Sequence, residues 1–204
     1  MHPNLAFRTE ETSRNIAFAR ERAFGTLAIN GADGPETCHV PFLLDEDGRE
    51  AELHLVRSNP IARIKAPEKA VVTVMGPDSY ISPDWYEVPD QVPTWNYVAL
   101  RLRGVLHPMP QEDLHPMLDR LSAHFETLLL PKTPWTSDKM GEGVMEKMMR
   151  MILPFRFEVT QIEGTWKLNQ NKPDDVRERA AKQVAAYGQG LEIQTLAALM
   201  LGAK

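Results

Sequence analysis

Three short segments near the N-terminus alternate between apolar and polar residues, and two turn-forming clusters separate them. The segments are 24–29, 36–44 and 51–56, and the clusters are Asn-Gly-Ala-Asp-Gly at 30–34 and Asp-Glu-Asp-Gly at 45–48. Alternation with a period of two is typical of strands with one buried face, and such turn sequences join antiparallel neighbours. The pattern therefore predicts an antiparallel meander that belongs to a sheet or a barrel.

Three further strands are expected at 71–75, 96–106 and 155–167. In the second of them, Val98, Leu100, Leu102 and Leu106 share one face, whereas Arg101 and Arg103 share the other face, so this strand is half-buried. About six antiparallel strands would leave vulnerable edges, and closure into a small barrel would protect those edges.

Helical periodicity lies between and after these strands. A helix at 9–22 would begin at Thr9, with Glu10 and Glu11 in its first turn. Further helices are expected at 58–66, 111–130 and 141–151, then in a C-terminal region that begins at Asn171 and ends with 191–201. The chain is therefore α+β, and we expect one domain over 1–204 with a helical extension over about 172–204.

Composition excludes several classes of function. A net charge of −5 disfavours a broad nucleic-acid surface. Cys38 is the single cysteine, and the histidines are not at metal-ligand spacings, so we expect no structural zinc and a reducing compartment. No nucleophile elbow, P-loop or dinucleotide-binding glycine motif is present. Without an apolar leader or an apolar run long enough to span a membrane, a cytoplasmic protein is expected.

The segment 76–97 concentrates aromatic residues and proline. It holds two of the four Trp, three of the four Tyr and four of the sixteen Pro. Rigid aromatic loops of this kind offer ring faces and N–H or O–H donors to a planar ligand. From composition alone, a loop whose rings plug one end of a barrel is an equal alternative.

A second candidate site lies where a strand meets a helix start, at Arg57-Ser58-Asn59-Pro60. A guanidinium, two short polar side chains and free N–H groups can together bind a phosphate. The alternative is that Ser58 or Asn59 only caps the helix while Arg57 is solvated.

Two other segments are rich in hydrogen-bonding groups. Asn96 lies between Trp95 and Tyr97, and its amide suits the edge of a heteroaromatic ring. Lys167, Gln170 and Asn171 lie where the last strand gives way to a helix, and they can hold an anion or a ring carbonyl. For the first segment, the alternative is that the Trp95 and Tyr97 rings pack into a barrel mouth. For the second, the alternative is a polar helix cap.

The chain resembles the PaiB-type family of FMN-binding negative transcriptional regulators. The resemblance runs from Pro3 nearly to the C-terminus and depends most on GPDSYISPDWY at 76–86, VPTWNY at 92–97 and KLNQNK at 167–172. It departs from the family at Asn169, where a Ser is usual, at Val56, where an Ala is usual, and at Arg101 and Arg103, where a His and an aromatic residue are expected.

The resemblance implies a six-stranded split β-barrel with peripheral and C-terminal helices. It further implies a homodimer with FMN bound non-covalently at the subunit interface. The phosphate would lie near Arg57, Ser58 and Asn59. The residues expected around the ring, the ribityl chain or the dimer seam are Tyr80, Ser82, Trp95, Asn96, Lys167, Gln170 and Asn171.

Activity is less constrained than cofactor binding. A flavin-dependent regulator and a small flavin oxidoreductase both fit the resemblance, and no residue is assigned a catalytic role. One alternative is a regulator that acts through DNA or a protein partner without flavin catalysis, although neither charge nor a helix-turn-helix motif supports direct DNA binding. A weaker alternative is a haem-handling barrel with His54 or His124 as the axial ligand.

Overall fold

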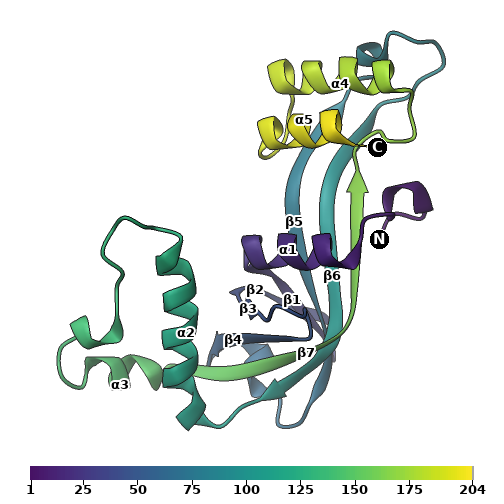
Figure 1. Cartoon of the computed structure of the whole chain (residues 1–204). Coiled ribbons are helices and arrows are strands. Elements are labelled where there is room, and N and C mark those ends of the chain that lie inside the picture. Colours follow the sequence, from purple (N-terminus) through teal and green to yellow (C-terminus); the bar gives the residue numbers. More distant parts are fainter. Residues whose placement is uncertain (204) are drawn as a thin grey trace. The chain divides into compact units, whose positions relative to one another are not determined.

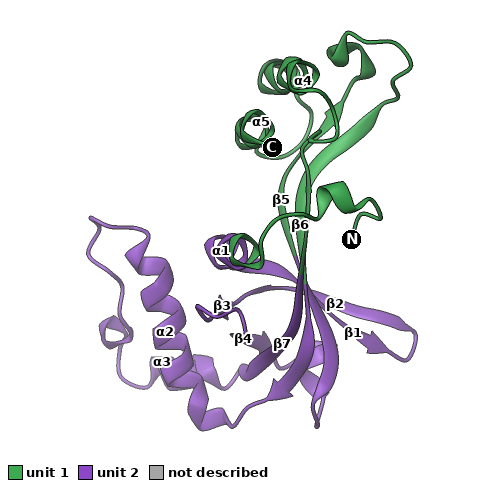
Figure 2. Cartoon of the chain, turned by 45° about the vertical axis from the view of Figure 1, so that its right-hand side comes forward, with its two compact units in different colours: residues 1–15, 74–101, 163–204 green, residues 16–73, 102–162 purple. Residues whose placement is uncertain are grey.

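The computed structural model describes residues 1–203, which form two compact units (Figure 2). Unit 1 comprises Met1–Asn15, Val74–Arg101 and the segment from Glu163 onward. Unit 2 comprises Ile16–Thr73 and Leu102–Ile162. Both units draw on β5, β6 and β7.

Seven strands form one sheet in the order β2-β1-β5-β6-β7-β4-β3. Every pairing with a defined register is antiparallel. The strands are β1 (Phe24–Gly31), β2 (Gly34–Pro41), β3 (Leu43–Leu44), β4 (Glu50–Val56), β5 (Glu68–Ile81), β6 (Thr94–Pro108) and β7 (Ile152–Lys167). The expected α+β, mainly antiparallel class is confirmed, whereas the expected number of six strands is wrong by one.

The additional strand arises from a break at Phe42, inside the segment expected to be one strand over 36–44. Here the chain leaves β2, and the Phe42 N–H donates to the Ala23 carbonyl at 2.9 Å. β2 and β3 lie at opposite ends of the sheet order, yet Phe42 alone separates them. The part of the sheet in unit 2 must therefore curl until its two edges approach each other. The chain joins those edges, but within residues 1–203 no ladder of hydrogen bonds closes the barrel.

The two expected turns are present. β1 and β2 pair as a hairpin that ends at Gly31 and Gly34. The turn between β3 and β4 is held by the Asp45 carboxylate, which accepts from the Arg49 N–H at 2.7 Å, and Gly48 adopts a φ of +70° there. That conformation favours glycine because a Cβ would be strained.

The α-helices are α1 (Thr12–Arg22), α2 (Leu114–Thr127), α3 (Val144–Met149), α4 (Asp174–Tyr187) and α5 (Ile193–Gly202). Short 3₁₀ helices occur at η1 (Leu5–Phe7), η2 (Pro60–Arg63), η3 (Pro83–Tyr86), η4 (Gln111–Asp113) and η5 (Ser137–Lys139). All expected helical regions exist, but most are shorter than expected.

Two helix starts differ from expectation. α1 begins at Thr12 and not near Thr9, because the Glu11 carbonyl accepts the first backbone hydrogen bonds, from Arg14 and Asn15. α4 begins after Pro173 without a side-chain cap, so Asn171 does not cap it. Asp174 and Asp175 do occupy its first turn, where the helix dipole favours acidic groups.

Alternation along β6 produces the cores of both units. Val98 and Leu100 are buried in unit 1, and Leu102 and Leu106 are buried in unit 2, as their shared face predicted. In unit 2, α2 adds Leu114 and Met117, both fully buried, and its Arg120 donates to the Glu52 carboxylate on β4. This ion pair joins α2 to the sheet near the start of β4.

In unit 1, α4 and α5 lie side by side and cover one face of β5 and β6 (Figure 1). The loop between the two helices also pairs with β5. The Asp78 N–H donates to the Leu191 carbonyl and the Tyr80 N–H to the Gln189 carbonyl, both at 3.0 Å. These bonds protect backbone groups of β5 that a free sheet edge would expose.

Candidate functional site

Arg57 follows β4 directly, and its guanidinium is held from two sides. Its Nε donates to the Arg150 carbonyl at 2.6 Å, and its Nη2 donates to Gln111 Oε1 at 2.7 Å. The Arg57 N–H also donates to the Met151 carbonyl at 2.9 Å. The side chain is therefore oriented by two separate segments of unit 2, at Gln111 and at Arg150, and it is not the loosely solvated group that the alternative interpretation required.

The charge of Arg57 is not neutralised by a carboxylate in the part of the chain that the structure describes. A guanidinium carries five N–H donors, and two of them serve Arg150 and Gln111. The remaining donors are available at an exposed position next to the exposed Ser58. A positioned cation with unused donors is suited to a bidentate anion such as phosphate.

Asn59 has a local structural role. Its Oδ1 accepts from the Ile61 N–H at 2.9 Å and caps η2, with Pro60 in the first turn. The helix expected over 58–66 is thus a four-residue 3₁₀ helix. The capping interpretation is confirmed for Asn59.

The aromatic segment 76–97 begins and ends in strands. Its first six residues belong to β5 and its last four to β6, so the true connection is 82–93 and contains η3. Tyr80 and Trp95 face each other across the two strands, with ring centroids 6.3 Å apart and planes at 75°. Trp95 is 49% exposed. These two rings form an accessible aromatic surface on unit 1, and Ser82 lies half-buried at the start of η3.

Asn96, by contrast, is fully buried beneath α5. Its Nδ2 approaches Met200 Sδ at 3.5 Å, and its buried Oδ1 has no hydrogen-bond partner among the residues that the structure describes. Asn96 follows Trp95 directly on β6, and successive side chains of a strand point to opposite faces, so the Asn96 side chain points away from Trp95. Its amide is not presented to solvent in this structure.

The residues from Lys167 to Lys172 form a tight turn. Asn169 adopts a left-handed φ of +64°, which Asn tolerates better than most residues, and Lys172 N–H donates to its carbonyl at 2.9 Å. The Gln170 side chain forms hydrogen bonds within the turn, because it accepts from the Leu168 N–H and donates to the Trp166 carbonyl. Asn171 is exposed.

Lys167 is half-buried at the end of β7. It donates to Thr94 Oγ1, and its ammonium lies 5.8 Å from the centroid of the Phe7 ring. Burial lowers the pKa of Lys167 below its ordinary value. No carboxylate among the described residues forms an ion pair with it, so an anion that reached this side chain would meet an uncompensated charge.

The structure adds Tyr86, which sequence reasoning did not assign to the site. Tyr86 is 1% exposed, and its hydroxyl donates to Asn169 Oδ1 at 3.3 Å. Its backbone carbonyl accepts from Arg179, and the Lys172 ammonium lies 4.9 Å from its ring centroid. Burial raises the pKa of the Tyr86 phenol. Asn169 occupies a position where the PaiB-type family usually has Ser, and this departure is the sequence signal that could have indicated its contact with Tyr86.

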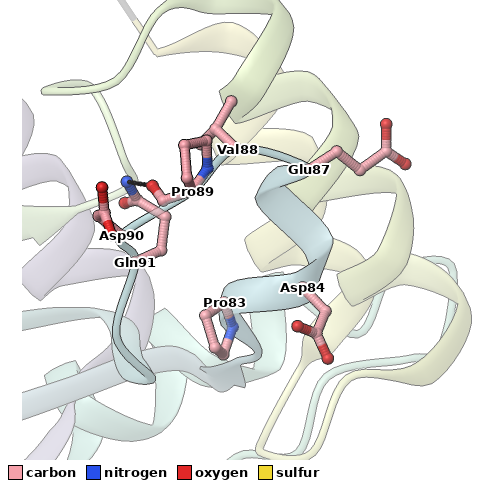
Figure 3. Close-up of a pocket in the computed structure, with 7 residues that line it drawn as sticks. All are labelled: Pro83, Asp84, Glu87, Val88, Pro89, Asp90 and Gln91. Atoms are coloured by element: carbon pink, nitrogen blue, oxygen red, sulfur yellow. Dashed lines mark hydrogen bonds between the residues drawn. The ribbon is translucent and has the colours of Figure 1, made fainter.

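A shallow hollow of about 520 Å³ lies along the connection between β5 and β6 (Figure 3). Its lining carries three carboxylates, those of Asp84, Glu87 and Asp90, and no cation. The Gln91 amide donates to the Pro89 carbonyl at 3.0 Å. A phosphate would be repelled here, so this hollow is not the anion site.

The predicted site residues are divided between the two units. Arg57, Ser58 and Asn59 belong to unit 2. The other seven belong to unit 1, namely Tyr80, Ser82, Trp95, Asn96, Lys167, Gln170 and Asn171. Within unit 1, the structure brings Tyr80 next to Trp95 and separates both from the buried Asn96 amide. Among the described residues, no group of three or more His, Cys, Asp or Glu side chains could hold a metal ion.

The chain therefore has an antiparallel α+β fold, with an oriented arginine in unit 2 and an exposed aromatic pair in unit 1. The chain belongs to the family described as "Putative FMN-binding domain", whose sequence profile matches residues 1–161. FMN, which combines a phosphate with a planar ring system, is accordingly its cofactor.

A curated relative supports the same family. The chain is 31% identical over 162 residues to the protease synthase and sporulation protein PAI 2 of Bacillus subtilis, and the match covers 76% of this chain and 75% of the relative. The resemblance to the PaiB-type family is thereby confirmed.

Solved structures with low sequence identity share the fold. The FAD and heme binding protein of Mycobacterium smegmatis superposes with a TM-score of 0.57 at 18% identity, covering 90% of this chain and 82% of the other. The flavocytochrome Anf3 of Azotobacter vinelandii superposes with a TM-score of 0.53 at 10% identity, covering 81% and 72%.

Proposed function

We propose that the chain is a homodimeric PaiB-like flavoprotein of the cytoplasm that binds FMN non-covalently and uses the flavin as a redox-active group. The observation that carries this proposal is the oriented guanidinium of Arg57, which forms no ion pair with a carboxylate of residues 1–203. FMN supplies one- and two-electron redox chemistry when bound. The protein contributes binding and orientation.

The residues present fit the two ends of FMN. Arg57 and the neighbouring hydroxyl of Ser58 would hold the phosphate, while Asn59 keeps η2 capped behind them. In unit 1, Trp95 and Tyr80 would contact the ring, with Lys167 as a donor to a ring carbonyl or an anionic reduced flavin. Ser82, Gln170 and Asn171 are proposed at the ribityl chain or the dimer seam. The amide of Asn96 is covered by Met200 of α5, and we assign it no contact with the flavin.

A comparison of FMN with riboflavin tests the phosphate assignment, since riboflavin lacks the phosphate. Arg57→Ala should weaken FMN by at least about tenfold, the effect of one charge-assisted hydrogen bond, and leave riboflavin affinity unchanged. The control is Arg63→Ala, an exposed arginine at the end of η2. Equal losses for both flavins, or an Arg63 variant as weak as the Arg57 variant, would contradict the assignment.

The ring assignment predicts the opposite pattern. Trp95→Ala removes an aromatic surface, so it should weaken FMN and riboflavin by the same factor, about five- to a hundredfold if stacking contributes 1–3 kcal/mol. Fluorescence quenching during titration measures both affinities. Unchanged affinities would remove Trp95 from the flavin site.

Subunit mixing tests the proposed homodimer. If each flavin site draws on two subunits, a mixture of Arg57→Ala and Trp95→Ala chains should regenerate sites with native affinity in the mixed dimers. Half-exposed Met75 and Trp95 are consistent with a further surface that a second copy covers. Monomeric sedimentation with full FMN binding would contradict the dimer, and the mixing result would then be negative.

A regulatory role is the first alternative. The relative from Bacillus subtilis is a protease synthase and sporulation protein by name, and such a role could depend on the flavin or on a protein partner. Direct DNA binding gains no support from the net charge of −5. A gel-shift series at falling salt concentration tests it, and the absence of a shift at low salt would exclude operator binding.

A haem-handling role is the second alternative. Two structural neighbours are named for haem or for a flavocytochrome, and Nδ1 of the half-buried His54 has no hydrogen-bond partner. Haem reconstitution of the His54→Ala and His124→Ala variants tests this role. A protein that gives no Soret band shift on haem addition would exclude it.

A further inference from the structure

A groove of about 600 Å³ crosses the outer face of the sheet in unit 2. None of the residues that line it is among those assigned above to flavin. Alternation identifies the face: Leu27, Val72 and Leu102 point into the core, so their neighbours on each strand point outward. The groove is formed by β1, β2, β5, β6 and β7 of unit 2, which lie together in Figure 2.

The floor of the groove is aliphatic. The register pairs Ala28 of β1 with Val71 of β5, and Val105 of β6 lines the same groove. All three are half-buried. Solvent-facing positions of an antiparallel sheet usually carry polar side chains, so a small apolar floor at this place calls for an occupant.

The rim of the groove is cationic. Lys69 and Arg103 line it together with the polar residues Asn30 and Thr160, and no acidic residue does. Lys69 is exposed and forms no ion pair with a described residue. The register places Ala70 opposite Ile29, so Lys69 lies next to Asn30 at one end of the groove. In a protein with a net charge of −5, a groove whose lining carries the ammonium of Lys69 and no acidic residue favours negative charge.

We propose that this groove binds a small organic anion, with its apolar body on the aliphatic floor and its carboxylate or phosphate against Lys69. The volume falls within the range of about 300–1,000 Å³ that small-molecule sites occupy. Thr160 Oγ1 already donates to the Arg103 carbonyl at 3.1 Å, so it can only accept a hydrogen bond from a ligand. Lys69 is therefore the residue that selects the anionic head group. The flavoprotein would bind this ligand in addition to FMN.

The experiment uses the full chain saturated with FMN and the fluorescent sulfonate 1-anilinonaphthalene-8-sulfonate as the probe. Lys69→Ala should weaken probe binding roughly two- to fivefold, as expected for an exposed charge pair. Lys182→Ala, at an exposed lysine of α4, should leave it unchanged. Decanoate and decyl phosphate should displace the probe, and their relative strength shows which head group fits. Decyltrimethylammonium should not displace it.

Two further variants test the aliphatic floor and the charge of the rim independently. Val71→Trp should fill the groove and abolish probe binding, while Lys69→Glu should exclude the sulfonate and admit decyltrimethylammonium. Circular dichroism and FMN titration confirm that each variant is folded, and Lys69→Glu decides the outcome where Val71→Trp does not fold. Equal probe binding by the Lys69 and Lys182 variants would overturn the proposal. So would dissociation of a dimer in the Lys69 variants, because the groove would then be a contact between subunits.

Discussion

Gln111 holds the guanidinium of Arg57 through a 2.7 Å hydrogen bond from Nη2 to Oε1, although 54 residues separate the two in the chain. The same Gln111 donates from Nε2 to the Met149 carbonyl at 3.2 Å. One amide therefore ties the end of β4 to the end of α3. Neither its position in the sequence nor its residue type marks it as part of an anion site.

Gln111→Ala should weaken FMN by a smaller factor than Arg57→Ala, because it removes the orientation of the cation and leaves the cation in place. A loss of roughly threefold to tenfold corresponds to one neutral or charge-assisted hydrogen bond. Riboflavin affinity should not change. The matched control is Glu112→Gln, at the exposed next residue. A Gln111 variant with native FMN affinity would show that Arg57 needs no support from it.

Asn96→Leu tests whether the buried amide contributes to the flavin site or only to a packed interior. Its Oδ1 has no partner, and an unsatisfied buried polar atom costs about 1–3 kcal/mol, so the free energy of unfolding should stay the same or rise. FMN affinity should not change, because Met200 covers the amide. Chemical denaturation and FMN titration measure the two quantities. A stable variant with tenfold weaker FMN would mean that α5 moves to expose Asn96.

Gly190→Ala should loosen the α4–α5 loop from β5. A Cβ at Gly190 would lie 2.2 Å from the Asp78 carbonyl oxygen, and its φ of +157° disfavours an L side chain. We expect a loss of about 1–3 kcal/mol in the free energy of unfolding. Amide exchange at Asp78 and Tyr80 should become faster, since their N–H groups donate to this loop. Gly202→Ala, where a Cβ meets nothing within 4 Å, is the neutral control.

His54 should make the protein sensitive to mild acid. Burial lowers the pKa of His54 below its ordinary value of 6.5. In the unfolded chain the His54 imidazole therefore binds a proton near pH 6.5, whereas in the folded protein it does so only at a lower pH. Stability is complete above that pH and falls as the pH drops from 6.5 toward the lower pKa of the folded state.

The His54→Leu variant should lose less stability than the native protein between pH 7.5 and pH 5.5, as urea unfolding at each pH would measure. His39→Leu, at an exposed position of β2, serves as the comparison. An unchanged pH dependence in His54→Leu would assign the acid sensitivity to other groups.

Local signals predicted many of the elements correctly. The turn cluster at 45–48 and the alternation along β6 depend on residues close in sequence, so their physics is local. The break at Phe42 was not predicted, because the apolar run Phe42-Leu43-Leu44 continues the segment expected to be one strand. Only the sheet order, which sends β2 and β3 to opposite edges, requires a break there.

The candidate site divides in the same way. The sequence by itself determined the residue types that suit FMN and the family to which the chain belongs, since both depend on short motifs such as 76–86 and 92–97. It also predicted that Asn59 could cap a helix. The tertiary structure decided that Gln111 orients Arg57, that Trp95 is exposed while Asn96 is buried, and that Tyr86 meets Asn169. Those contacts join residues far apart in the chain, and only packing brings such residues within hydrogen-bond distance.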